Sequence, residues 1–211
     1  MSKGLSNILD EVISEFRPLL LERQFVEKGK RDFVRKIKSD YNREEKITFS
    51  ARLHRSDPNT IYVACTIGLY YPSVKKIESF FITDHLSKYP IFAGSISHFS
   101  ESNMFLSVPY KTEVNLTEVV EEIKNELESG AFNLISIFPT LESIYLGIID
   151  KHPFLYTFYN SYQERELLMI TCIVLLLYGK DKALEWAQEN FREGSYKDGI
   201  IERLLVFEFT K

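Results

Sequence analysis

The sequence predicts an α+β fold: a mostly antiparallel sheet of about five strands, with two helices in the N-terminal half, followed by a helical C-terminal half. Apolar and polar residues alternate with a period of two along residues 46–70, which is typical of half-buried paired strands. Helical spacing dominates after residue 111, and no linker or low-complexity run divides the chain. We therefore expect a single domain over residues 1–211, with a sheet half at 1–110 and a helical half at 111–211.

The chain is expected to open with an amphipathic helix over Leu5–Gln24, where apolar residues recur at helical spacing. Pro18 argues for a kink or a restart, because proline lacks the backbone N–H that continues a helical hydrogen-bond ladder. Arg31–Lys38 follows as a short strand whose charges suit a solvent-exposed sheet edge.

The alternating segment predicts an antiparallel hairpin, with the turn-rich stretch Arg55–Asn59 as its loop. This loop sets a register in which Arg52 lies opposite Tyr62 and Leu53 lies opposite Ile61. The residues expected to face the core are Ile47, Phe49, Ala51 and Leu53 on the first strand, and Ile61, Val63, Cys65, Ile67 and Leu69 on the second.

Further elements are expected as one helix, two strands and then helices to the end of the chain. The expected ranges are a helix capped by Ser73 and ending near Leu86, strands over Phe92–Phe99 and Asn103–Val108, and helices over Asn115–Gly130, Thr140–Ile148, Ser161–Tyr178, Asp181–Phe191 and Tyr196–Leu204. Ser161–Tyr178 is apolar on nearly every face, so we expect it to be central. Val206–Phe209 either extends the last helix or forms a strand.

Composition indicates an ordinary globular protein, with 45% hydrophobic and 27% charged residues. The N-terminus lacks the apolar core of a signal peptide, and the longest apolar run, residues 167–178, is shorter than a bilayer requires. Cys65 and Cys172 fall on expected core positions, which favours free thiols in a reducing compartment, although the sequence leaves a disulfide between them open. We expect a cytoplasmic protein without a membrane partner.

Motifs for catalysis are missing from the sequence. It contains no Gly-rich phosphate loop, no dinucleotide fingerprint and no nucleophile elbow. The four histidines are scattered, and none lies at metal-ligand spacing from another ligand type, so a metal site would have to be assembled in space. We expect no catalytic residues, no metal and no cofactor, and we favour a role other than an enzyme.

An acidic helix and an aromatic segment are the first candidates for a partner surface. Residues 111–211 carry 10 lysines and arginines against 17 acids, whereas residues 1–110 carry 16 against 13. The sequence offers Glu121, Glu122 and Glu126 to steer a basic protein partner, and Tyr156 and Tyr159 to anchor it. The alternatives are a solvated helix face and a loop packed against the core.

The outward face of the hairpin is the second candidate. It carries Arg52, His54, Tyr62 and Tyr70, and an arginine over a tyrosine ring makes a reasonable recognition spot. If a cleft lies here between sheet and helices, the chain binds a small molecule or is an unrecognised enzyme. If helices cover this face, the same residues serve packing.

A third candidate is the basic segment Lys28–Lys38, which has six basic residues and one acid, Asp32. It suggests a nucleic-acid surface or a charged edge strand that discourages aggregation. The acidic character of the whole chain, with a net charge of −4, makes nucleic acid the less favoured of the two.

Residues 20–35 run Leu-Leu-Glu-Arg-Gln-Phe-Val-Glu-Lys-Gly-Lys-Arg-Asp-Phe-Val-Arg. They resemble the opening of the bacterial domain-of-unknown-function family number four-three-zero-four, in which a helix leads through a Gly-Phe-Lys-Lys-like turn into a Phe-x-Arg strand. The matching residues are Phe25, Lys28, Gly29, Phe33 and Arg35, while Gln24 stands where the family usually has glycine. The similarity extends over Gly68–Pro72, Pro139–Leu141 and Tyr178–Ala183.

The resemblance implies no catalytic residues. Comparable small acidic bacterial domains often neutralise toxins, which is an association with the class and not a mechanism. We therefore expect a non-catalytic bacterial protein-binding domain, with a toxin-neutralising (immunity-type) protein as its most concrete form. The alternative is the small-molecule-binding domain or unrecognised enzyme that would use the sheet–helix cleft.

Overall fold

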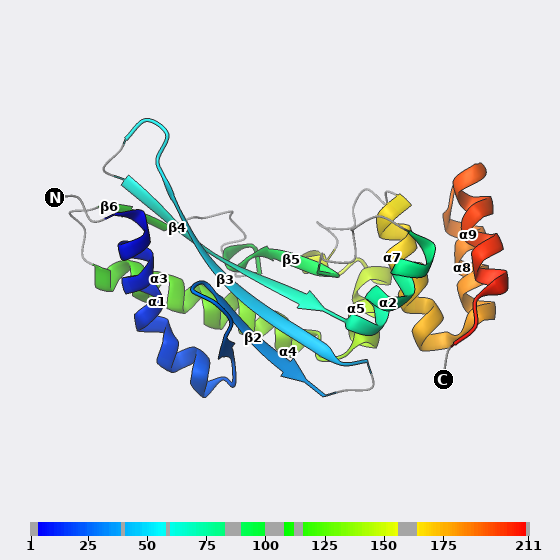
Figure 1. Ribbon diagram of the computed structural model, residues 1–211, viewed down its shortest axis with the longest axis horizontal. Coiled ribbons are helices and arrows are strands. Elements are labelled where there is room, and N and C mark those ends of the chain that lie inside the picture. Colours follow the sequence, from blue (N-terminus) through cyan, green and yellow to red (C-terminus); the bar gives the residue numbers. More distant parts are fainter. Residues whose placement is uncertain are drawn as a thin grey trace. The chain divides into compact units, whose positions relative to one another are not determined.

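The computed structural model has the α+β architecture that the sequence predicts (Figure 1). The residues that it describes are 4–38, 41–57, 60–82, 90–99, 108–111, 116–155 and 164–209. They group into two compact units, which we call the sheet unit (Met1–Lys38, Arg43–Tyr70 and Phe92–Ile137) and the helical unit (Ser39–Asn42, Tyr71–Ile91 and Phe138–Lys211). The expectation of a single domain stays a prediction.

The sheet unit is built on an antiparallel sheet with the strand order β1-β2-β3-β4-β5, in which β6 also pairs with β4. The strands are β1 (Val26–Glu27), β2 (Asp32–Ile37), β3 (Arg43–Leu53), β4 (Thr60–Tyr70), β5 (Phe92–Ser95) and β6 (Val108–Lys111). Arg52 pairs with Tyr62 and Leu53 with Ile61, so the predicted register of the hairpin is confirmed.

The two strands of the hairpin alternate between buried and more exposed residues, as the sequence pattern predicts. Ile47, Phe49, Val63 and Ile67 are all completely buried on the inward face. Leu53 was expected among them, but it is 56% exposed because it is the last residue of β3, next to the hairpin loop. The inward face is therefore the apolar face over most of its length.

Helix α1 (Leu5–Glu22) covers part of this inward face. Its buried residues are Ile8, Leu9, Val12, Ile13, Phe16 and Leu20. The ring of Phe16 stacks on that of Phe49 with centroids 5.3 Å apart, and Phe33 meets Phe49 edge-on at 6.0 Å. Pro18 lies within the helix without ending it. It is exposed, so the lost backbone hydrogen bond falls away from the apolar stripe that holds the helix in place.

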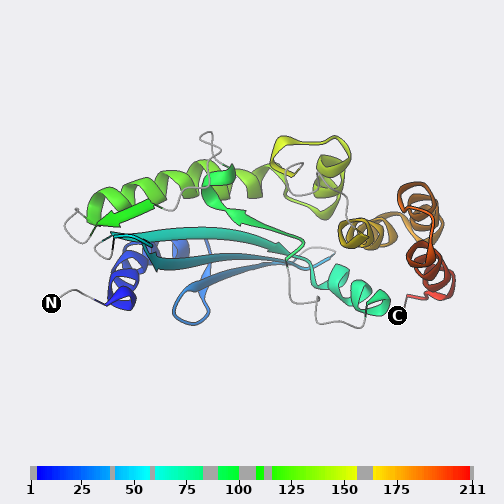
Figure 2. The same cartoon turned by 90° about the horizontal axis from the view of Figure 1, so that it is seen from above.

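A long helical run follows the sheet in the sequence and extends along it (Figure 2). It consists of α3 (Leu116–Glu126), the π-helical turn η3 (Leu127–Phe132) and α4 (Asn133–Ile137). The expected stop at Gly130 is wrong. Gly130 is buried within η3, and Leu134 and Ile135 continue the buried stripe beyond it, so packing outweighs the cost of about 1 kcal/mol for a glycine in a helix.

Three short strands, β1, β5 and β6, differ from the expectation. The strand expected over Phe92–Phe99 ends at Ser95, and the 3-10 turn η2 (Ile96–Phe99) completes it. β6 begins at Val108, while residues 103–107 of the strand expected there lie outside the described residues. The two-residue strand β1 was not predicted, because a strand so short leaves no alternation to recognise.

Helices make up most of the described part of the helical unit. They are α2 (Pro72–Phe81), α5 (Leu141–Ile149), α7 (Glu164–Tyr178), α8 (Lys180–Asn190) and α9 (Ser195–Val206). Every residue from Leu167 to Leu175 is buried, which confirms that this apolar helix is central. Gly179, at φ 86°, turns the chain from α7 into α8, and α8 and α9 lie side by side (Figure 1).

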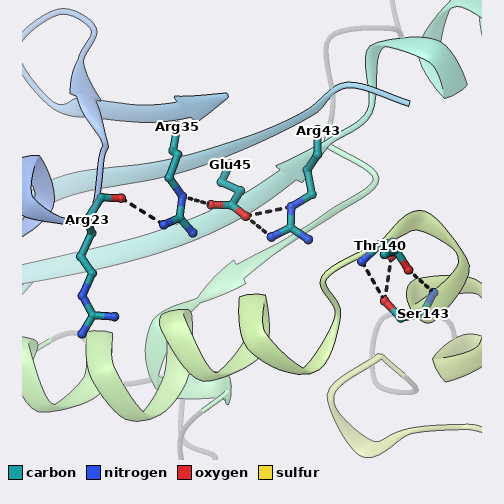
Figure 3. Close-up of polar contacts among 6 residues, drawn as sticks. All are labelled: Arg23, Arg35, Arg43, Glu45, Thr140 and Ser143. Carbon is teal, nitrogen blue, oxygen red and sulfur yellow. Dashed lines mark hydrogen bonds and ion pairs between the residues drawn. The ribbon is translucent and has the colours of Figure 1, made fainter. Parts of the chain in front are cut away.

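The predicted helix starts have mixed outcomes. Thr140 caps α5 in a capping box, with its hydroxyl accepting the Ser143 N–H at 3.0 Å (Figure 3). Ser73 is not a cap: Tyr71 is the N-cap and Pro72 occupies the first helical position, where its missing N–H costs nothing. The caps expected at Asn115 and Ser161 lie outside the described residues.

The C-terminal ends of α2 and α9 can be compared with the expected ones. Helix α2 ends at Phe81, and most of the stretch toward the expected end near Leu86 lies outside the described residues. Helix α9 extends to Val206, whereas Phe207, Glu208 and Phe209 have no regular secondary structure. Of the segment Val206–Phe209, only Val206 extends the last helix, and residues 207–209 form neither helix nor strand.

Candidate binding surfaces

A groove of about 540 Å³ lies between α1 and α3 in the sheet unit. We call it the α1–α3 groove. On the α1 side it is lined by Glu15, Phe16, Pro18, Leu19 and Glu22. These positions repeat at three- and four-residue intervals, so they share one face of the helix. Phe16 forms a buried floor, Leu19 is half-buried, and the two glutamates are exposed.

Helix α3 supplies the other wall, through Leu116, Thr117, Val120, Glu121 and Lys124. Val120 and Leu116 are half-buried, while Glu121 and Lys124 are exposed. The walls together carry three carboxylates and one ammonium above an apolar floor. Such a lining is complementary in charge and polarity to a surface that is both basic and apolar.

The three predicted steering acids do not share one surface. Glu121 lines the α1–α3 groove, whereas Glu122 and Glu126 line a separate cavity of only about 10 Å³ beside Cys65 and Ser97. Glu122 is exposed and Glu126 is half-buried. Glu121 and Glu122 point in different directions, because residues one position apart lie about 100° apart around a helix. Glu126 lies four positions after Glu122 and therefore shares its side of α3.

Two other acids enter the groove that the sequence did not bring forward, Glu15 and Glu22. Their signal was present, since acids seven residues apart on an amphipathic helix fall on the same face. Their pairing with Glu121 depends on α1 lying beside α3, which is a contact between distant parts of the sequence. The aromatic anchors Tyr156 and Tyr159 lie outside the described residues, so their role stays a prediction.

The outward face of the hairpin brings three of its four predicted residues together. The guanidinium carbon of Arg52 lies 5.4 Å from the centre of the Tyr62 ring, and the ring of His54 lies 5.3 Å from it. The backbone N–H of Ser56 donates to Nδ1 of His54 at 3.3 Å. Arg52 is exposed, and the other two are half-buried. This arrangement is an open cluster at the end of the hairpin.

Tyr70 belongs to a different part of the same face. It pairs with Glu44 and lies eight residues from Tyr62 along β4, which is about 26 Å in an extended strand. Burial raises the pKa of its phenol, and the nearby Lys46 opposes that rise. The four residues therefore do not converge on one site, and neither of the two cavities described above includes any of them.

Small and polar side chains occupy the outward face between these two ends. Thr48 donates to Asp32 at 2.8 Å, and Lys46 forms an ion pair with the same carboxylate at 2.8 Å. Thr48 and Lys46 are half-buried, and Ser50 is exposed. In the described part of the sheet unit, α1 packs against the opposite, apolar face. The outward face is thus polar between its two ends, and the charges of Lys46 and Asp32 are paired there.

A buried charge network lies on the inward face, next to the apolar residues that the sequence predicts there (Figure 3). Arg43 donates to one carboxylate oxygen of Glu45, from Nε at 2.8 Å and also from Nη2, while Nε of Arg35 donates to the other oxygen at 2.6 Å. The Glu45 side chain is completely buried and that of Arg43 is 2% exposed. Because guanidinium donors occupy both oxygens, Glu45 is a structural residue and not a general base.

The network continues to the edge of the sheet. A second nitrogen of Arg35 donates to the backbone oxygen of Arg23 at 3.0 Å (Figure 3), and its guanidinium lies 4.8 Å from the centre of the Phe25 ring. Arg23 in turn pairs with Glu128 at 2.8 Å and stacks on Phe132 at 4.6 Å. These contacts tie β2 and β3 to the turn η3, so the network holds the helical run on the sheet.

The basic segment Lys28–Lys38 loses part of its charge to these contacts. Arg35 serves the buried network, and Lys36 pairs with Glu44 at 2.9 Å. Lys28, Lys30, Arg31 and Lys38 are exposed. The short strand β1 pairs with Phe33 and Val34, so β2 is the second strand of the sheet and not the edge strand that was the other interpretation of this segment.

Both cysteines, and one ion pair of the helical unit, are buried. Lys75 and Glu78 on α2 form a buried ion pair at 2.5 Å. Cys172 on α7 is buried and free, and burial raises its pKa, with the Glu78 carboxylate adding to the rise. Cys65 in the sheet unit is also buried and free, and burial raises its pKa. Neither thiol is activated as a nucleophile.

Other sites and known proteins add no assignment. Among the described residues, no group of three or more histidine, cysteine, aspartate or glutamate side chains could hold a metal ion. In the same part of the chain no single helix is long and apolar enough to cross a membrane, and the bent pair Leu116–Ile137 with Leu141–Ile149 meets that test only when both segments are counted together. Comparisons with protein-family models, curated proteins and solved structures find no match. The family resemblance of residues 20–35 stays a prediction.

Proposed function

We propose that this chain is a non-catalytic protein-binding domain with a basic protein partner, and that a toxin-neutralising (immunity-type) protein is the concrete form of this role. The observation that carries the proposal is the α1–α3 groove, in which three carboxylates surround an apolar floor. The mechanism is occlusion, in which the bound domain covers the surface that the partner needs for its own activity. No catalytic group is required.

Charge steers the partner to the groove. Glu121, Glu15 and Glu22 raise the local concentration of a basic surface and speed its association, and this effect weakens as salt screens it. Apolar contacts with Leu19 and Val120 then slow dissociation, because they remove apolar surface from water. Tyr156 and Tyr159 remain the proposed aromatic anchors, outside the described residues.

Affinity capture from a lysate of the source cells tests the proposal. The purified chain is compared with a Glu121→Lys/Glu122→Lys variant and with a control variant, Glu189→Lys/Glu202→Lys, whose exposed acids lie on α8 and α9. Both variants change the net charge equally. We expect a basic protein that the wild type and the control retain at low salt and that the α3 variant loses.

Kinetics of the captured pair complete the test. Charge reversal at Glu121 and Glu122 should slow association at low salt and flatten its dependence on salt, because it removes part of the steering field. An unchanged association rate, or equal losses in the α3 variant and the control, contradicts the proposal. A toxin-like reading frame beside the gene for this chain, with growth rescue on co-expression, would establish the immunity form.

A second candidate function is binding of a small molecule at the cluster of Arg52, His54 and Tyr62. The observation that favours it is the contact of both basic groups with one tyrosine ring on an open sheet face. It ranks second because neither described cavity includes these residues. Thermal-shift measurements with anionic aromatic compounds test it, and a shift that the Arg52→Ala variant retains in full would exclude this cluster as the site.

A further inference from the structure

We infer that the α1–α3 groove accepts a helical segment of about two turns that carries two basic residues seven positions apart, with apolar residues between them. The inference rests on the proposed function and specifies which feature of the basic partner is recognised. Its basis is the length, charge pattern and backbone chemistry of the groove.

The length of the groove matches two helical turns. On α1 the lining begins at Glu15 and ends at Glu22, and on α3 it begins at Leu116 and ends at Lys124. Seven and eight residues of helix correspond to about 10 Å and about 12 Å along the axis. A partner helix lying along α1 therefore contacts the groove with about two of its own turns.

The charges repeat with the same spacing. Glu15 and Glu22 mark the two ends of the α1 wall, so basic residues at positions i and i+7 of a partner helix would each meet one of them. Glu121 adds a third carboxylate from the opposite wall. In the described part of the chain, none of these three acids forms an ion pair with a basic side chain, so all three are open to a partner.

The apolar floor of the groove determines which residues we expect between the two basic residues of a partner helix. Phe16 is buried at the base, Leu19 and Val120 are half-buried on opposite walls, and Pro18 is exposed. Apolar side chains at i+3 and i+4 of a partner helix fall between its two basic residues and on the same face. They would cover the part of this floor that water now contacts.

The backbone of both walls favours a helix over an extended segment. An extended peptide needs partners for its N–H and C=O groups, usually a strand edge. Both walls of this groove are helices, whose backbone groups are mostly paired within each helix. A helical segment satisfies its own backbone groups, so it needs only the side-chain contacts that the groove offers.

Two synthetic peptides of identical composition test the inference on the full chain. Both are amphipathic 18-residue helices; the first has lysines at i and i+7 around leucines at i+3 and i+4, and the second has its lysines moved to the opposite helical face. Fluorescence anisotropy measures their affinities at low salt. We expect the first to bind about tenfold more tightly, because only its charges and apolar residues face the groove together.

Matched variants locate the binding. Glu15→Gln/Glu22→Gln removes two carboxylates from the groove, whereas Asp10→Asn/Glu118→Gln removes two exposed ones from the same helices outside it. Because all four residues are exposed, both variants should fold. We expect the groove variant to lose about fivefold in affinity for the first peptide, as two exposed ion pairs contribute, and the control to stay within about twofold.

Either of two results overturns the inference. If both peptides bind equally, or if both variants lose affinity equally, then the acidic surface attracts basic chains without regard to the groove. Both results leave the proposed function standing, because a basic partner still binds. The proposed function fails separately if charge reversal at Glu121 and Glu122 leaves the captured proteins unchanged.

Discussion

Replacing Glu45 by glutamine should destabilise the sheet unit by about 3–5 kcal/mol, which is the usual cost of breaking a buried ion pair by removing one partner. The change keeps the side-chain shape and removes its charge. It leaves the guanidiniums of Arg43, 2% exposed, and Arg35, 20% exposed, facing each other without the carboxylate between them. Most of the cost comes from Arg43, since water screens Arg35 in part.

The neighbouring residue provides the control. Glu44 lies on the same strand but on the outward face, where it pairs with Lys36, whose side chain is 68% exposed. Glu44→Gln removes the same charge from the same strand and should cost less than about 1 kcal/mol, because exposed ion pairs contribute little. The two variants therefore separate the effect of burial from the effect of charge.

Urea unfolding followed by far-ultraviolet circular dichroism measures both free energies, and amide hydrogen exchange in β3 and β4 reports the sheet unit directly. The double variant Arg43→Met/Glu45→Met should lose less than the sum of its single variants, because it removes the completely buried charges together and leaves only Arg35, 20% exposed, without its carboxylate. A loss below about 1 kcal/mol for Glu45→Gln, or one equal to that of Glu44→Gln, would refute the structural role of this network.

Three further predictions concern caps, glycines and thiols. Thr140→Ala should cost the helical unit about 0.5–2 kcal/mol, measured by urea unfolding with the fluorescence of the single tryptophan, which lies in α8. Gly147→Ala should destabilise the helical unit, since the new Cβ would lie 2.5 Å from a buried phenylalanine ring. Gly199→Ala should stabilise the same unit by about 0.5–1 kcal/mol, because nothing lies within 4 Å of its new Cβ. The opposite order of the two variants in thermal unfolding would contradict both predictions. Cys65 and Cys172 should resist a thiol reagent at pH 8 until the chain is unfolded, because burial raises both pKa values and blocks access; rapid labelling of the native protein would place them at the surface.

The fold class and the hairpin could be predicted because their signals are local. Alternation with a period of two fixes which residues face inward, and a short loop fixes the pairing of Arg52 with Tyr62. Glu45 could not be predicted in this way, since an acid at an inward position breaks the alternation and its two arginine partners are not visible in the pattern. Its burial depends on contacts that alternation does not contain.

The candidate site shows the same limit. Glu121 could be identified from the acidic face of its helix, but its connection to Glu15 and Glu22 requires α1 and α3 to lie together, and they are separated by about a hundred residues. The helix end predicted at Gly130 was wrong for a related reason. Glycine usually ends a helix when solvent surrounds it, whereas here tertiary packing carries the helical run through it as a π-helical turn.

Strand β4 has a consequence for the order in which the chain folds. Its pairing with β3 joins neighbouring segments, so this hairpin can form as soon as both strands exist. Its other edge is shared by two short strands, β5 against residues 66–69 and β6 against residues 60–63, and β6 arrives some forty residues later in the chain. During synthesis β5 can cover residues 66–69 first, whereas residues 60–63 keep an open edge until β6 emerges, and this open edge could pair with another nascent chain.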